Sequence, residues 1–177
     1  AEDSKMWLYD FDKKTLNNIS SNWGNVKHPM NAHFSPDGKK IVFMGIGNDA
    51  WNVYLYELNT QKDPENLTPD PTTRDEDPKY SPDGKKIIFK RNGKLVQMDL
   101  DSDSRAIEEL SDGSIEYSMP YYNADGTKLV FSAGDGENSS ILMMDLKTKS
   151  IQTLYDAVGI QDYYPINADA TSFYYSR

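Results

Sequence analysis

Short apolar runs alternate with polar turns along the whole chain, and no segment carries apolar residues at helical spacing. Gly, Pro, Asn and Asp interrupt these runs at intervals of roughly ten residues. The longest apolar run, Ile41 to Gly47, has the length of a strand and falls well short of the ~20 residues of a membrane helix. The pattern therefore predicts an all-β fold without membrane insertion.

One sequence block recurs four times and divides the chain into similar units. It reads Ser-Pro-Asp-Gly-Lys-Lys-Ile-Val-Phe at 35–43 and Ser-Pro-Asp-Gly-Lys-Lys-Ile-Ile-Phe at 81–89, with looser copies at 123–131 and 167–175. Its aspartate stands at 37, 83, 125 and 169, at intervals of 46, 42 and 44 residues. An acidic residue followed by an apolar one keeps the same spacing at 10–11, 57–58, 99–100 and 145–146. Repeats of this length indicate a stacked or radial architecture.

Each unit is expected to form four short antiparallel strands. Pro-Asp-Gly is a turn signal, and the Asn92-Gly93 pair is a strong signal for a two-residue hairpin. In the second unit the strands are expected at 78–81, 87–90, 95–100 and 106–110. Four antiparallel strands in each repeat are typical of a β-propeller blade.

The phase of the repeat suggests how such a ring could close. The chain opens with the third and fourth strands of a unit and ends with a first and a second strand. We therefore expect a small propeller of about four blades, whose N-terminal outer strands pair with the C-terminal inner strands. The predicted blade units are 21–68, 69–111, 112–155 and a split blade of 1–20 plus 156–177. The competing interpretation is a fragment, or half of a ring that a second chain completes, so the chain would be a monomer or a dimer.

The Ser-Pro-Asp-Gly-Lys-Lys-Ile-x-Phe blocks, each followed by a strand ending in Asp-Leu or its equivalent, resemble the WD40-like repeat of TolB-type propellers. The same repeat occurs in propellers of prolyl oligopeptidase relatives and of oligogalacturonate lyases. The resemblance implies a binding module in the periplasm or at the cell surface. The chain begins at Ala1, which is compatible with a signal peptide that has been removed.

Composition narrows the possible chemistry. The net charge of −9 disfavours nucleic-acid partners, because such a surface repels phosphate backbones. The absence of cysteine excludes thiol nucleophiles, disulfides and iron–sulfur clusters. With a length of 177 residues the chain fits one domain or one repeat array.

Three motifs that could carry chemistry do not fit their contexts. His28 and His33 lie in one unit, without the Gly-x-Ser-x-Gly elbow of a serine hydrolase and too few for a histidine metal cluster. Residues 45–50 imitate a dinucleotide fingerprint, but a strand pattern follows where the chemistry needs a helix. Residues 99–103 imitate a calcium loop, but Ser104 and Leu110 replace its Gly and Glu. We predict no catalytic residue, no metal and no cofactor.

Candidate ligand contacts gather where loops should share one face of the ring. Asp75-Glu76-Asp77 is expected either at a channel mouth that holds a cation or as an exposed acidic loop. Aromatic residues with polar neighbours suit sugars or peptides, although tyrosine could equally replace phenylalanine in the packing between sheets. The predicted ligand-binding residues are Trp51, Arg91, Asp77, Glu116, Tyr117, Asp162 and Tyr163.

These observations predict a non-catalytic binding or scaffold module that recognises a protein, a peptide or a carbohydrate through loops on one face. The alternative is the accessory propeller of a hydrolase, or a degraded polysaccharide lyase.

Overall fold

The computed structural model of residues 1–177 describes the chain except for 1–3, 61, 135–137, 158–163, 169–172 and 177. The described part of the chain contains sixteen β-strands and no α-helix, which confirms the predicted all-β fold class. Within the same residues there is no helix long and apolar enough to cross a membrane.

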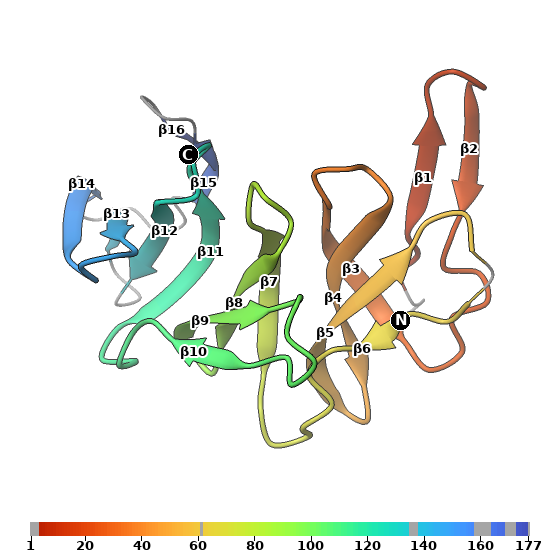
Figure 1. The fold of residues 1–177 in the computed structure, drawn as a ribbon, viewed down its shortest axis with the longest axis horizontal. Helices are drawn as coiled ribbons and strands as arrows, with labels where there is room; N and C mark the ends of the chain where they lie inside the picture. Colours follow the sequence, from red (N-terminus) through yellow and green to blue (C-terminus); the bar gives the residue numbers. More distant parts are fainter. Residues whose placement is uncertain (1–3, 61, 135–137, 158–163, 169–172, 177) are drawn as a thin grey trace.

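Three antiparallel four-stranded sheets follow one another along the chain and form an arc (Figure 1). Blade 1 consists of β3 (Lys27–Phe34), β4 (Lys40–Gly47), β5 (Ala50–Glu57) and β6 (Glu65–Asn66). Blade 2 consists of β7 (Asp75–Tyr80), β8 (Lys86–Arg91), β9 (Lys94–Asp99) and β10 (Ile107–Glu109). Blade 3 consists of β11 (Glu116–Tyr122), β12 (Lys128–Gly134), β13 (Ser139–Asp145) and β14 (Ile151–Ala157). In each blade every strand pairs with the next one in sequence.

The two ends of the chain form separate two-stranded sheets. β1 (Trp7–Asp10) pairs with β2 (Thr15–Asn18), and β15 (Tyr164–Ala168) pairs with β16 (Phe173–Ser176). These sheets lie at opposite ends of the arc, so the pairing expected to close the ring is not seen among the described residues (Figure 1). Each half-blade instead follows its sequence neighbour: Met6 and Ile19 pack against the core of blade 1, and β15 contacts β11 and β12 of blade 3.

The repeated Ile-x-Phe block is buried on both sides of its strand. In β8, Ile87 and Phe89 join the core shared with blade 1, whereas Ile88 joins the core shared with blade 3. Side chains alternate between the faces of a strand, so a strand packed on both faces needs a continuous apolar run. This is why the second strand of each of the three four-stranded blades carries the strongest sequence signal, as in Val42 and Phe43 of β4 and Phe131 of β12.

The first strand of each blade is interrupted at one repeated position. The register shifts after Met30, after Glu76 and after Ser118. The residues that follow these sites, Asn31, Asp77 and Met119, have positive φ angles of 54°, 56° and 50°. A bulge re-aims the side chains beyond it, and here it does so in the strands that contact one another in series, β3 with β7 and β7 with β11.

A tyrosine at the end of the first strand distinguishes the two blade interfaces. Between blades 2 and 3, the Tyr122 hydroxyl donates to the Gln97 Oε1 atom at 2.9 Å. Between blades 1 and 2, Tyr80 takes the place of Tyr122 and Leu55 takes the place of Gln97.

Gln97→Leu is expected to leave the buried Tyr122 hydroxyl without a partner and to lower the free energy of unfolding by about 1–3 kcal/mol. The reciprocal change Leu55→Gln should raise it, since Tyr80 would gain an acceptor. Urea unfolding of both variants tests this, and destabilisation of equal size in both would contradict it.

Candidate functional site

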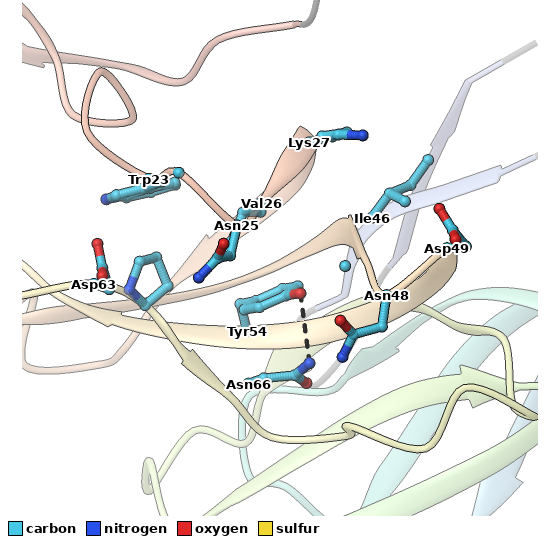
Figure 2. A pocket seen from close by; sticks show the side chains of 13 residues that line it. Trp23, Asn25, Val26, Lys27, Ile46, Asn48, Asp49, Tyr54, Asp63 and Asn66 are labelled. Carbon is cyan, nitrogen blue, oxygen red and sulfur yellow. Dashed lines mark hydrogen bonds between the residues drawn. The ribbon is translucent and has the colours of Figure 1, made fainter.

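A pocket of about 490 Å³ opens on the face that carries the β4–β5 turn and the connection into β3 (Figure 2). We call this face, which also carries the β8–β9 turn at Asn92–Gly93, the loop face. The pocket lies against blade 1, between the segment at 23–27, the turn at Asn48–Asp49 and the entry to β6. All three boundaries are connections between strands, the place where propellers and other rigid scaffolds vary their chemistry.

Three amide side chains contribute to the polar lining of this pocket. Asn25, Asn48 and Asn66 supply both donors and acceptors, and the Tyr54 hydroxyl lies 3.4 Å from the Asn66 Nδ2 atom (Figure 2). Burial raises the pKa of Tyr54, so the phenol stays neutral and can donate. The remaining wall is partly apolar, with Trp23, Val26 and Ile46, and partly charged, with Lys27, Asp49 and Asp63.

Local backbone geometry builds the pocket. Asn48 and Asp49 have φ angles of 52° and 62°, the conformation of a tight hairpin turn for which Asn and Asp are favoured. A Cβ atom at Gly47 would collide with the Tyr54 hydroxyl, so the glycine makes room for that group at the pocket floor. Trp23 is buried against Phe43, with ring centroids 4.9 Å apart, and so contributes a rigid wall.

Arg91, a predicted ligand contact, is held by an ion pair inside blade 2. Its Nε and Nη2 atoms donate to the Asp75 Oδ1 and Oδ2 atoms at 2.7 and 2.9 Å. The side chain of Asp75 is 0% exposed and also accepts a hydrogen bond from the Thr73 hydroxyl at 3.0 Å. The arginine is therefore the counter-ion of a buried carboxylate, and its two-pronged donor set is already used.

The acidic triplet Asp75-Glu76-Asp77 is not an exposed loop, so that interpretation is wrong. The other interpretation, carboxylates at a channel mouth that hold a cation, stays a prediction. All three residues are buried in β7. Asp77 joins three blades: it accepts from the Asn31 Nδ2 atom of β3 at 2.7 Å and from the Met119 amide of β11 at 3.4 Å. The position of Asp77, a predicted ligand contact, is therefore that of a residue that links neighbouring blades.

Glu76 belongs to a small charged network that reaches the surface through Glu116. Burial alone would raise the pKa of Glu76, but hydrogen bonds from Arg74 and Lys90 outweigh it and lower that pKa. The Lys90 Nζ atom lies 2.9 Å from Glu76 and 3.3 Å from Glu116. The Glu116 side chain is 68% exposed, so among the predicted contacts this carboxylate is available to a ligand on the loop face.

The remaining predicted contacts do not converge on the pocket. Tyr117 is buried edge-on against Phe131, with ring centroids 5.2 Å apart, as expected for packing between sheets. Trp51 lies half-buried in β5, opposite Ile46. Asp162 and Tyr163 lie outside the described residues.

A second group of polar residues sits on the first strands just beyond the bulges. The Tyr80 amide donates to the His33 Nδ1 atom at 3.1 Å, and the Lys79 Nζ atom lies 5.1 Å from the centre of the Tyr121 ring. Lys79 is 3% exposed, and its ammonium donates to the Pro78 carbonyl at 3.3 Å. Burial lowers the pKa of Lys79 to about 8, while the charge of Asp77 partly offsets this. Burial, together with the charge of Lys79, lowers the pKa of His33 to about 4.

The described residues contain no group of three or more His, Asp or Glu side chains arranged to hold a metal ion. The sequence patterns did not point to the amides of the pocket or to the neighbourhood of His33 and Lys79. The Asn48–Asp49 turn signal on the loop face could have pointed to the pocket amides. Polar residues at the matching repeat positions 33, 79 and 121 could have pointed to the group that contains His33 and Lys79.

Consecutive four-stranded meanders whose first strands contact one another in series define an arc of propeller blades. The chain is thus a blade-repeat protein with a pocket on its loop face. The model of the TolB beta propeller domain, PD40, matches residues 1–174, and the chain belongs to that family.

Three known proteins illustrate the relationship. An uncharacterized protein of Agrobacterium fabrum is 26% identical over 138 residues, covering 72% of this chain and 46% of that protein. TolB of Acinetobacter baumannii superposes with a TM-score of 0.72 at 23% identity, covering 91% of this chain and 39% of that one. An oligogalacturonate lyase in complex with manganese gives 0.57 at 22% identity, covering 70% and 38%. This chain spans less than half of each of them, and the two structural matches show the fold.

Proposed function

We propose that the chain is a non-catalytic binding or scaffold domain that recognises a carbohydrate through the loop-face pocket of blade 1. The pocket chemistry carries the proposal. Sugar hydroxyls donate and accept at once, and they are matched by groups with the same property, which here are the three asparagine amides and the neutral Tyr54 hydroxyl. The volume of about 490 Å³ lies within the range of small-molecule sites.

The candidate contacts differ in what they can contribute. Trp23 is 6% exposed and packs on aromatic neighbours, so the pocket would act through hydrogen bonds more than through ring stacking. Asn25 is exposed, which leaves its side chain accessible to a ligand. Protein and peptide ligands, the other two classes that the sequence suggests, present fewer hydroxyl groups to such a lining.

Asn25→Ala is expected to weaken sugar binding at least about fivefold, the loss of one net hydrogen bond, with unchanged stability. The measurement is saturation-transfer NMR with a panel of neutral and uronic mono- and oligosaccharides, followed by titration of the ligands that bind. Gln152→Ala, which removes an exposed amide from β14 in blade 3, serves as the matched control. Equal weakening in both variants, or binding of peptides but of no sugar, would contradict the proposal.

The alternative, a propeller-type lyase or hydrolase component, is tested on the same samples. A lyase acting on uronate polymers forms an unsaturated product that absorbs ultraviolet light, and a binding domain leaves the polymer intact. Turnover of any of these polymers would overturn the non-catalytic assignment.

Location and assembly belong to the same proposal. TolB-like homologues are periplasmic, and we infer an extracytoplasmic location for this chain. Among the described residues, each half-blade is a two-stranded sheet and not a complete four-stranded blade, which supports completion of the ring by further blades or by a second chain. In either case the pocket of blade 1 would be unchanged, because all its lining residues lie between 23 and 66.

A further inference from the structure

A groove lies between blades 1 and 2 on the face opposite the loop face, where the Pro-Asp-Gly turns project. It has a volume of about 420 Å³ and is lined by the turns at 35–37, 83–84 and 100–105. A groove of the same construction, about 1080 Å³, lies between blades 2 and 3. The two grooves are built from residues at equivalent repeat positions, so their differences identify what is particular to the first one.

The first difference is a buried hydroxyl without a hydrogen bond. Tyr122 lines the second groove, and its hydroxyl donates to Gln97 at 2.9 Å. Tyr80 occupies the same position in the first groove and is 4% exposed, but Leu55 replaces the glutamine. Within the part of the chain that the structure describes, the Tyr80 hydroxyl has no partner. An unsatisfied buried hydroxyl is costly, and its presence beside a groove points to a partner that comes from outside.

The second difference is charge. The first groove is lined by two cationic residues, Lys40 and Arg105, and by five carboxylates: Asp37, Glu57, Glu65, Asp83 and Asp101. The second groove has three lysines and four carboxylates. The first groove therefore carries the larger excess of negative charge, which favours a cationic occupant.

Arg105 already shows how such a group is held. Its Nη1 atom donates to the Leu100 carbonyl at 3.2 Å, and its Nη2 atom lies 3.6 Å from the Glu65 Oε2 atom. The side chain reaches the groove from the β9–β10 turn and is about one-third exposed. It pairs with Glu65 only loosely and would compete with an external cation for the same carboxylate.

We propose that the groove between blades 1 and 2 binds a small organic cation with N–H donors, an alkylammonium or a guanidinium, which donates to the Tyr80 hydroxyl oxygen and pairs with Glu65. This site is on the other face from the carbohydrate pocket and does not depend on it. Lys40 and Arg105 are long side chains that can move aside to admit the ligand.

Titration calorimetry with putrescine at low salt tests the proposal, with neutral 1,4-butanediol as the uncharged analogue. Saturable binding of putrescine and none of butanediol is expected. Tyr80→Phe should weaken putrescine binding about tenfold, because a hydrogen bond to a charged group is lost. Arg105→Gln should strengthen it, because the internal competitor for Glu65 is removed. Tyr122→Phe, the matched change in the second groove, should leave the affinity unchanged.

The variants separate binding from folding. Tyr80→Phe removes a hydroxyl that makes no hydrogen bond in the described structure, so its thermal unfolding should match or exceed that of the parent chain. A loss of affinity in this variant therefore reports on the ligand contact. The proposal is overturned if putrescine does not bind saturably, if Tyr80→Phe binds it as well as the parent chain, or if Tyr122→Phe weakens it equally.

Discussion

Arg91→Ala is expected to lower the free energy of unfolding by about 3–5 kcal/mol, the cost typical of leaving one member of a buried ion pair without its partner. The affected partner is Asp75, whose side chain is 0% exposed and loses both short hydrogen bonds from the guanidinium. Thr73 alone cannot neutralise that carboxylate. Arg91→Lys should have an intermediate effect, because a lysine keeps the charge but not the two-pronged geometry.

The control is the double replacement Asp75→Leu with Arg91→Leu. Removing both charges from a buried pair leaves nothing unsatisfied between them, so the double variant should be more stable than Arg91→Ala alone. Chemical denaturation of the three proteins gives the comparison. A loss below about 1 kcal/mol in Arg91→Ala, the size expected of an exposed ion pair, would show that Arg91 is free for ligands after all.

The blades were predictable because their strongest signal is a packing requirement. A strand buried on both faces demands apolar residues without alternation, and Ile87, Ile88 and Phe89 meet it between polar turns. The turn residues Pro82, Asp83 and Gly84 act locally, so their meaning does not depend on the rest of the fold. Ring closure could not be predicted in the same way. The phase of the repeat identifies the two half-blades, but it does not specify which strand each half-blade pairs with.

The acidic triplet shows why exposure is hard to predict from composition. Three adjacent carboxylates suggest an exposed acidic segment, whereas their environment depends on the strand across the hairpin. β7 and β8 pair Asp75 with Arg91 and Glu76 with Lys90, so the neutralising charges lie at a distance fixed by the register. Reading the two strands as a hairpin would have predicted this pairing. The roles of Asp77 and Lys79 could not be obtained in this way, because their partners Asn31, Met119 and Tyr121 belong to other blades.

Lys79→Met is expected to stabilise the protein by about 3 kcal/mol at pH 7. The lysine is 3% exposed, and none of the carboxylates in the described residues lies within ion-pair distance of its ammonium. Burial lowers the pKa of this lysine from 10.5 to about 8, and at about 1.4 kcal/mol for each pH unit this corresponds to a net cost of about 3 kcal/mol for the buried charge. Methionine fills a similar volume with an unbranched chain and no charge. Lys85→Met, at an exposed position, should change stability by less than about 0.5 kcal/mol.

The pH dependence distinguishes burial of a charge from better packing. Below pH 8 the ammonium is protonated in both states, and its full cost is present. Between pH 8 and 10.5 the unfolded chain keeps a proton that the folded chain has released, so the stability of the parent protein rises with pH. The advantage of Lys79→Met should therefore shrink by about 2 kcal/mol between pH 7.5 and 9.5.

This window lies below the range in which the buried tyrosines act. Burial raises the pKa of Tyr121 above its usual 10, so the folded chain retains phenolic protons that the unfolded chain loses, and stability falls above pH 10 for both proteins. Urea denaturation at half-unit steps from pH 7 to 9.5 measures the difference between the two proteins. An advantage that is constant across the window would mean that methionine only packs better. A destabilised Lys79→Met would mean that the contacts of the ammonium with the Pro78 carbonyl and the Tyr121 ring outweigh the cost of its burial.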